Sequence, residues 1–418
     1  MIGDFVRRSS VAVPDAANPR IFSGSERIFE PQRSQRLSME IVNAGIYLHI
    51  PFCRSKCRYC SFVSSAGHEE QTERYCRALI RELRALGGKL DGKPAVDTIY
   101  FGGGTPSLLA AIQVEHVLAA CRDVFEVASD NEISLEANPG TMDRDQLRAW
   151  REAGVNRVSL GAQSFSDLEL AAIGRIHRAA EIQSAWERLR GSGLKNLNID
   201  LMLGLPGQTS ASWRETLEKA AALHPSHVSV YMLEMDPKVP LFQAVAGGLC
   251  TLPDDDAVAG WYGETIDFLE SRGYRQYEIS NFAIPGCECR HNLKYWRCQP
   301  VFAFGVAAHS FDGAARYANT AHLVEYLERV EGGGSPIHWH QHADDQRQME
   351  ERIFLGLRLR QGLDWAWIRR DFHEEKAASW DARIREFVEE GLLEWHDSKL
   401  RLTRRGMLLS NEVFQNFV

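Results

Sequence analysis

The chain has 418 residues, of which 44% are hydrophobic and 25% are charged, and its formal net charge is −8. This balance is that of a globular protein with two or three domains, and the acidic charge argues against a nucleic-acid partner. Apolar runs fall well short of the roughly 18–20 residues that span a bilayer. Nine cysteines, an odd number, favour a reducing compartment. We therefore expect a cytoplasmic protein with at most peripheral membrane contact.

Residues 1–44 are rich in Ser, Arg, Pro and Asn and show no helical or strand period. This composition predicts a disordered extension. Its arginines would suit a transit peptide, but its acidic residues do not. Met39 is an alternative start of the protein to Met1.

From residue 45 onward, short runs of β-branched and aromatic residues alternate with helix-like segments. This alternation predicts an α/β fold with parallel strands and crossover helices. Six such strands are too few for an eight-fold barrel, so we expect an open partial (βα)6 barrel or a doubly wound sheet. The expected strands are 46–50, 97–101, 132–138, 157–163, 196–203 and 227–234, and the expected helices are about 68–88, 109–125, 143–153, 178–191 and 210–224.

The pattern changes after residue 240. We expect a helix at 254–272, a single strand at 277–282 and a Gly-rich linker at 331–336. The last part of the chain reads as helices followed by a β-hairpin at 391–406, as in a small winged-helix domain. The predicted domains are a core barrel at 45–240, an extension at 241–335 and a C-terminal domain at 336–418.

Three cysteines at C-x3-C-x2-C spacing, Cys53, Cys57 and Cys60, follow the first predicted strand. Loops after the strands form the functional face of an α/β barrel. Three close thiolates suit a 4Fe–4S cluster whose fourth iron takes an outside ligand. A zinc site completed by a distant residue, or reduced structural thiols, are the alternatives. We expect basic residues within the loop to lower the thiol pKa values, namely Arg54, Lys56 and Arg58.

The segment GGGTP, residues 102–106, ends the second predicted strand. Its glycines leave room for a ligand to approach the backbone, although a tight strand-to-helix turn explains them equally well. Polar residues also mark the ends of later strands: Glu136, Asn138, Gln163 and Asp200, with Arg175 downstream. A buried acid such as Asp200 is costly unless it is paired or bound to a ligand.

Residues 285–298 hold further potential metal ligands, including His291 in the sequence HNLKYW. A histidine beside aromatic side chains suits a flat macrocycle, but a loop packed by its own aromatics is the simpler interpretation. His309, in the small-residue run FGVAAHSF, is a second candidate of the same kind. The other potential ligands are Cys287, Cys289 and Cys298.

Together these motifs resemble the radical S-adenosylmethionine (SAM) superfamily over nearly the whole chain from residue 45. Within it, the chain is similar to the branch of the oxygen-independent coproporphyrinogen III oxidase HemN and the heme chaperone HemW, and HemW is the more similar. The matching segments are YLHIPFC, GGGTP, EANPGT, GAQSF, GRIH, NIDLMLGLPGQT and HNLKYW. The resemblance implies a 4Fe–4S cluster whose open iron binds SAM, the source of a 5′-deoxyadenosyl radical.

The resemblance also implies roles for individual residues. The cluster ligands would be Cys53, Cys57 and Cys60. The first SAM would lie near Tyr47, Tyr59, Gly103 and Glu136. Positions that contact a second SAM in the oxidase correspond here to Gly104, Thr105, Gln163, Arg175 and Asp200.

One departure from the oxidase pattern is informative. The oxidase has a fourth cysteine two residues after the third, and this chain has Phe62 there, as HemW-type proteins do. The resemblance therefore implies a heme chaperone that binds heme through His291 and delivers it to membrane-bound respiratory apo-proteins. Coproporphyrinogen III oxidase, or another radical SAM tetrapyrrole enzyme, is the alternative. A homodimer is compatible with the resemblance.

Overall fold

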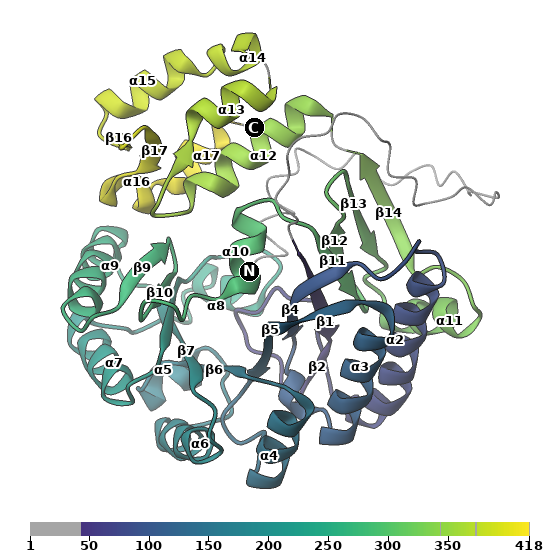
Figure 1. Ribbon diagram of the computed structural model, residues 1–418. Coiled ribbons are helices and arrows are strands. Elements are labelled where there is room, and N and C mark those ends of the chain that lie inside the picture. Colours follow the sequence, from purple (N-terminus) through teal and green to yellow (C-terminus); the bar gives the residue numbers. More distant parts are fainter. Residues whose placement is uncertain (1–42, 343, 373, 418) are drawn as a thin grey trace.

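The computed structural model describes residues 43–342, 344–372 and 374–417. A large mixed sheet runs through the molecule, and its centre consists of parallel strands that neighbour each other in chain order (Figure 1). Residues 1–42 lie outside the described residues. They include all but the last two residues of the expected extension 1–44, and also the alternative start at Met39. The central strands are β1 (Ala44–Ile50), β4 (Ala95–Gly103), β5 (Glu126–Ala137), β6 (Arg157–Gln163), β7 (Asn196–Leu203) and β8 (His227–Met232).

This strand order decides between the two expected architectures. A doubly wound sheet reverses direction at a switch point, whereas here each strand lies beside the next one in the chain. Right-handed crossovers then place every helix on the same face, so the sheet curls into a partial barrel. Figure 1 shows this ring of helices outside the strands. The ring includes α2 (Thr72–Gly87), α3 (Ala111–Val124), α4 (Arg144–Ala153), α6 (Ala179–Gly191) and α7 (Ser210–Ala222).

Helix α4 illustrates how local sequence sets these boundaries. The Asp143 side chain accepts a hydrogen bond from the backbone N–H of Gln146, a capping interaction. Gly154 ends the helix at φ 111°, a left-handed conformation that glycine adopts without strain. Leu147 and Trp150 are buried between these ends and fix the helix against the sheet. The predicted bounds, 143–153, agree to within one residue.

The sheet extends beyond β8 in a way that the sequence did not predict. The single strand expected at 277–282 is wrong, because the chain reverses there as the hairpin β9 (Arg275–Glu278) and β10 (Asn281–Ala283). The Glu278 carboxylate accepts a hydrogen bond from the Ser280 N–H at 2.9 Å and stabilises the turn. Strand β10 then pairs antiparallel with β8.

The other edge of the sheet is also longer than expected. Strand β11 (Val301–Phe304) pairs parallel with β1, and β12 (His309–Phe311), β13 (Ala315–Asn319) and β14 (Ile337–His342) follow it antiparallel. The Gly-rich segment expected as a linker connects α11 (Leu323–Glu331) to β14. The domain boundaries themselves remain predictions.

The C-terminal part is mostly helical and contains the expected hairpin, β16 (Leu393–His396) with β17 (Lys399–Leu402), which two short helices follow. It lies beside the barrel, at the top of Figure 1. Its other elements are α12 (Asp345–Leu357), β15 (Leu363–Asp364), α13 (Trp365–Phe372), α14 (Glu374–Ala378), α15 (Asp381–Glu389), α16 (Arg404–Leu408) and α17 (Ser410–Gln415).

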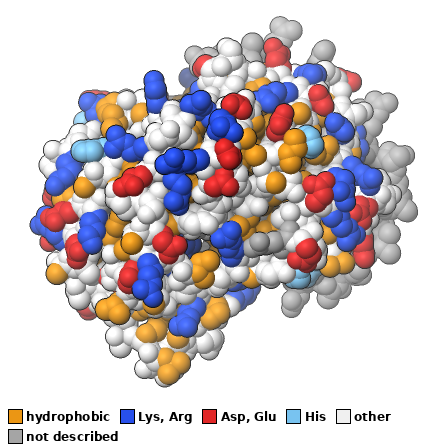
Figure 2. Space-filling view, turned by 90° about the horizontal axis from the view of Figure 1, so that it is seen from below, with side chains coloured by type: hydrophobic (Ala, Val, Ile, Leu, Met, Phe, Trp, Pro, Cys, Tyr) orange, Lys and Arg blue, Asp and Glu red, His pale blue; other side chains and the backbone are white. Residues whose placement is uncertain are grey.

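Three further helices bear on the site or close the barrel: α8 (Pro240–Ala246), α9 (Asp255–Glu270), which was expected at 254–272, and α10 (Arg290–Trp296). Basic and acidic side chains are interspersed over the face seen in Figure 2. Within the described ranges, every helix is too short or too polar to cross a bilayer.

Candidate functional site

The three motif cysteines lie in one loop, residues 51–66, that leaves the carboxyl end of β1; we call it the cluster loop. Cys53 belongs to the short strand β2 (Phe52–Cys53), which pairs with β3 (Ser65–Ala66) at the far end of the loop. The Arg58 N–H donates to the Ile173 carbonyl at 2.9 Å, and the Arg58 carbonyl accepts from the Leu241 N–H in α8. Neighbouring segments therefore hold the loop, with all three thiols free and half-buried.

Two of the thiols have polar neighbours from outside the cluster loop. The Thr105 hydroxyl donates to Cys53 Sγ at 3.5 Å, and Arg175 Nη1 donates to Cys57 Sγ at 3.6 Å. Burial raises the pKa of the Cys53 and Cys60 thiols. Lys56 acts on the Cys60 pKa in the expected, lowering direction, and Arg175 from outside the loop does the same for Cys53, but desolvation of the thiolate outweighs both charges.

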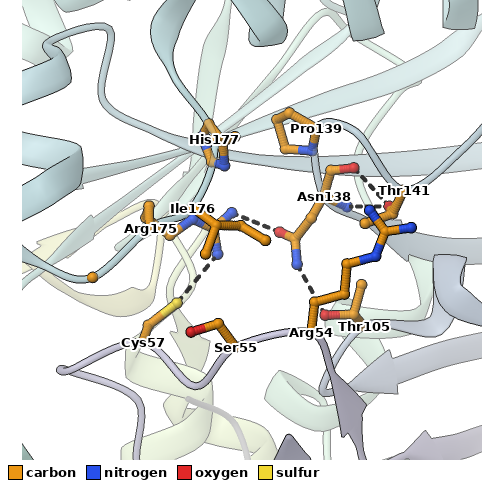
Figure 3. Close-up of a pocket in the computed structure, with 11 residues that line it drawn as sticks. Arg54, Ser55, Cys57, Thr105, Asn138, Pro139, Thr141, Arg175, Ile176 and His177 are labelled. Atoms are coloured by element: carbon orange, nitrogen blue, oxygen red, sulfur yellow. Dashed lines mark hydrogen bonds between the residues drawn. The ribbon is translucent and has the colours of Figure 1, made fainter. Parts of the chain in front are cut away.

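Behind Cys57, a chain of hydrogen bonds joins three strand ends (Figure 3). Arg175 Nη2 donates to Asn138 Oδ1 at 2.6 Å and also to the Gly161 carbonyl. Asn138 Nδ2 in turn donates to Thr105 Oγ1 at 2.9 Å. The structure thus brings together Thr105 and Arg175, as expected, and makes Asn138 the residue between them. Its position at the end of β5 was the signal in the sequence.

In GGGTP the backbone passes so close to the cluster loop that a side chain at Gly104 would not fit. A Cβ on Gly104 would lie 2.7 Å from the Phe52 carbonyl oxygen and 3.0 Å from Cys53 Sγ. Gly103 has φ 113° and donates its N–H to Glu136 Oε2 at 3.1 Å. Arg175 Nε is buried without a hydrogen-bond partner. The close approach at Gly104 leaves no room for a Cβ, the thiols are half-buried, and one nitrogen of the Arg175 cation, Nε, lacks a partner. These features fit a cluster with a bound anionic ligand.

Glu136 and Tyr47 lie deeper, inside the barrel. Glu136 Oε1 accepts a hydrogen bond from the Tyr100 hydroxyl at 2.8 Å. Burial raises the pKa of Glu136 to about 7, although that hydrogen bond opposes the shift. The Tyr47 hydroxyl hydrogen-bonds His49 Nδ1 at 3.2 Å, and its ring stacks on Tyr100. Tyr47 is thus connected to the cluster loop through His49, whose Nε2 lies 2.8 Å from the Val63 carbonyl.

The remaining predicted SAM residues occupy three different settings. Asp200 accepts hydrogen bonds from Ser159 and Asn198, both at 2.7 Å, and burial raises its pKa. This carboxylate is therefore satisfied by hydrogen bonds within the barrel. Gln163 is buried in a left-handed conformation, φ 69°, at the end of β6. Tyr59 packs against a small apolar group beside α8, which consists of Ile173, Met202, Leu205, Val239 and Leu241.

His291 lies at the opposite end of the barrel from the cluster loop. Helix α10 covers the beginnings of β1 and β4, and Figure 1 shows it against the centre of the barrel. The His291 ring is 1% exposed and stacks on Tyr100, with ring centroids 5.1 Å apart. Its Nδ1 lies 2.9 Å from Thr98 Oγ1 and its Nε2 lies 3.3 Å from the Tyr295 hydroxyl. Burial lowers its pKa to about 3.

The cysteines near α10 do not join His291 in a ligand set. Cys289 Sγ contacts Glu132 at 3.6 Å, and burial raises the pKa of Cys289 and of Cys298. Across the described ranges, no three His, Cys, Asp or Glu side chains gather closely enough to hold a single metal ion. His291 is therefore a buried residue in this structure, and direct coordination of heme iron would require α10 to move.

Comparison with protein families and solved structures places this geometry in context. Residues 47–220 match the radical SAM superfamily, and residues 343–409 match the HemN C-terminal domain. The solved structure of coproporphyrinogen III oxidase (HemN) from Escherichia coli, a radical SAM enzyme, superimposes with a TM-score of 0.79. It is 25% identical in sequence, and the match covers 90% of each chain.

Curated relatives are more similar in sequence. The heme chaperone HemW of Bacillus subtilis is 36% identical over 377 residues, which cover 89% of this chain and 98% of the relative. The heme chaperone HemW of Escherichia coli is 40% identical over 266 residues, 63% of this chain and 69% of the relative. On this end-to-end similarity, the chain belongs to the radical SAM superfamily and, within it, to the HemW family.

Proposed function

We propose that the protein is a heme chaperone of the HemW type that holds a 4Fe–4S cluster and SAM at the carboxyl end of its barrel. The observation that carries this proposal is the similarity to the curated heme chaperone of Bacillus subtilis over 98% of that relative's length. The fit of the cluster loop and its surroundings supports it. Delivery of heme to respiratory apo-proteins, a cytoplasmic location and a homodimer are parts of the same proposal.

The site residues divide into three tasks in this proposal. Cys53, Cys57 and Cys60 would hold three irons, and the backbone at Gly104 would pass close beneath them. Arg175 would hold the loop end and offset negative charge. Glu136 would accept a hydrogen bond from a polar group of SAM. When bound, the cluster supplies an electron to SAM.

The heme part of the proposal is tested by titrating the purified protein anaerobically with hemin and recording absorption spectra. Saturable binding with a spectrum distinct from that of free hemin is expected. Absence of such binding in cluster-loaded protein would refute the chaperone function.

The cluster part has an independent test. Iron and sulfide are measured per chain after anaerobic reconstitution of the wild type and of a variant with Cys53, Cys57 and Cys60 all changed to Ala. The variant is expected to lose the cluster. A full complement of iron and sulfide in that variant would overturn the ligand assignment.

Coproporphyrinogen III oxidase is the second candidate, favoured by the likeness to the HemN structure. Phe62 counts against it, because it stands where that oxidase has a fourth cysteine, and its side chain has no metal-binding atom. Its carbonyl accepts a hydrogen bond from Lys56 Nζ at 3.1 Å. Anaerobic incubation with coproporphyrinogen III, SAM and a reductant decides the matter. No protoporphyrinogen is expected, and its formation would favour the oxidase.

A further inference from the structure

Strand β14, which has the sequence IHWHQH, carries three histidines at alternate positions: His338, His340 and His342. It is the end strand of the large sheet and pairs with β13 (Figure 1). All three histidines are exposed. Alternate residues of a regular strand share one face of the sheet, so the sequence alone would place all three imidazoles together.

The pairing with β13 sets His338 apart from the other two. On β13, Ala318 and Asn319 are neighbours, but their partners on β14 are two residues apart, on either side of His338. His338 is thus the extra residue of a bulge, where a strand bends and the regular alternation is interrupted. His340 and His342 belong to the regular part of the strand and keep a common face.

The rings of His340 and His342 lie side by side on this face. Their centroids are 5.0 Å apart, and the ring planes meet at 81°. A Zn–N bond is about 2.0–2.1 Å long and the centre of an imidazole lies roughly 1.1 Å behind its nitrogen, so two imidazoles on one tetrahedral ion have centroids about 5 Å apart. The observed spacing is therefore that of two ligands of a single ion.

Strand pairing fixes the backbone beneath this pair. His340 pairs with Tyr317, and His342 pairs with Ala315. The Tyr317 ring is buried and stacks on the His340 ring, with centroids 6.4 Å apart and planes 27° apart. Ligands that are placed by a regular element and supported by packing lose little freedom when an ion binds.

The nitrogens of the two rings are open to a ligand. In the part of the chain that the structure describes, neither ring makes a hydrogen bond or an ion pair, and the aromatic contacts of the pair are with each other and with Tyr317. A neutral imidazole always has one nitrogen with a lone pair. His291 differs, since both of its ring nitrogens bond to hydroxyls inside the barrel.

We propose that His340 and His342 together chelate one divalent transition-metal ion, such as Zn²⁺ or Ni²⁺, at the outer edge of the sheet. Imidazole suits these ions. Two protein ligands leave the other positions of the ion to water or to a group from another molecule. They also agree with the absence of any three-residue metal cluster from the described ranges. The site is separate from the cluster loop and is not required by the proposed heme-chaperone function.

The test is anaerobic isothermal titration of the cluster-loaded full chain, without a polyhistidine tag, with Ni²⁺. Ni²⁺ is the probe because Zn²⁺ also suits the cysteine thiolates. His340→Ala and His342→Ala are each expected to weaken binding at least tenfold, since disturbing even the surroundings of metal ligands costs roughly 10–100-fold. The matched control, His338→Ala, removes an exposed histidine from the same strand and is expected to keep the wild-type affinity.

The double variant His340→Ala/His342→Ala separates one shared site from two independent ones. Two ligands of one ion act as a unit, so the double variant is expected to bind no more weakly than the weaker single variant. Wild-type affinity in either single variant would overturn the pairing. An equal loss in His338→Ala would reveal unspecific binding to exposed histidines and would overturn it as well.

Failure of the wild type to bind Ni²⁺ at one site per chain would refute the metal site and leave the heme-chaperone function standing, because hemin binding and cluster content are measured separately. Melting temperature and cluster content are recorded for every variant. All three histidines are exposed, so both quantities are expected to match the wild type.

Discussion

At the scale of single residues, two kinds of contact decide the shape of the candidate SAM site. The first is steric, because the backbone at Gly104 lies against the backbone of Pro51 and Phe52 and against Cys53 Sγ. The second is the planar fork of Arg175, which reaches Cys57, Asn138 and the Gly161 carbonyl at once. Both contacts fix the cluster loop from the barrel side.

Gly104→Ala is expected to displace the cluster loop. The new methyl group would lie 2.7 Å from a carbonyl oxygen, and overpacking of this kind costs about 1–3 kcal/mol. Reconstituted iron content and the free energy of unfolding should both fall. The control is Gly260→Ala in α9, where a Cβ meets nothing within 4 Å and the helix should gain about 0.5–1 kcal/mol. Equal behaviour of the two variants would contradict the steric argument.

The substitution Arg175→Lys tests whether the planar guanidinium of Arg175, with its several directed hydrogen bonds, is needed at the site. Lysine keeps the charge but cannot make several directed hydrogen bonds in one plane. We expect reconstitution to yield less cluster and SAM to bind about tenfold more weakly, measured by iron content and by isothermal titration. Arg178→Lys, at an exposed position three residues later, should match the wild type. Wild-type affinity in Arg175→Lys would show that charge alone suffices.

At the scale of elements, a buried carboxylate ties the barrel to the strands beyond β1. Glu82 in α2 accepts hydrogen bonds from Asn319 Nδ2 at 2.6 Å, from the Tyr326 hydroxyl at 2.7 Å and from the Gly305 N–H. It therefore connects α2, β13, α11 and the turn that carries His309. Burial raises its pKa to about 7, although these hydrogen bonds oppose the shift.

Glu82 predicts a pH dependence of stability. The folded protein holds this proton up to about pH 7, whereas the unfolded chain releases it near pH 4.5. The folded state then binds more protons in between, so this contribution to stability is complete below pH 4.5 and is lost as the pH rises to about 7. In Glu82→Gln this loss, at most about 3 kcal/mol, should disappear. Urea unfolding across pH 4.5–8 measures the difference.

The matched control for this prediction is Glu115→Gln on the exposed side of α3. It should follow the wild-type profile, including the opposing contribution of the buried histidines. Parallel pH profiles of the wild type and Glu82→Gln would refute the linkage.

At the scale of the whole molecule, the C-terminal part attaches to the barrel through β9. The Arg360 N–H donates to the Tyr277 carbonyl at 3.0 Å. Arg358 Nη2 lies 3.2 Å from the fully buried Glu278 carboxylate, and its guanidinium lies 4.3 Å from the centre of the Trp296 ring in α10. One arginine thus joins α12, β9 and the helix that closes the barrel.

Arg358→Met is expected to leave Glu278 buried without its cation, at a cost of about 3–5 kcal/mol. Thermal unfolding should shift down, and limited proteolysis should cut between the barrel and the C-terminal part. Adding Glu278→Gln should recover part of the loss. Arg77→Met, which breaks the exposed Arg77–Glu73 pair of α2, should cost about 0.5 kcal/mol or less. A similar loss in both single variants would contradict the role of burial.

The sequence by itself determined the elements and the chemistry of the cluster loop. Strands β6 and β7 lie where they were predicted, because periodicity and capping are properties of neighbouring residues. The cysteine spacing and the other motifs together likewise indicated the family, because each motif is a property of neighbouring residues. Asn138 was found as a polar strand end for the same local reason.

Only the tertiary structure decided the rest. The strand order shows a partial barrel and not a doubly wound sheet. A hairpin replaces the single strand expected at 277–282, and β11–β14 extend the sheet beyond β1. The tertiary structure also places His291 inside the barrel. These outcomes depend on contacts between residues far apart in the chain, such as Thr98 with His291, and local patterns carry no information about such pairs.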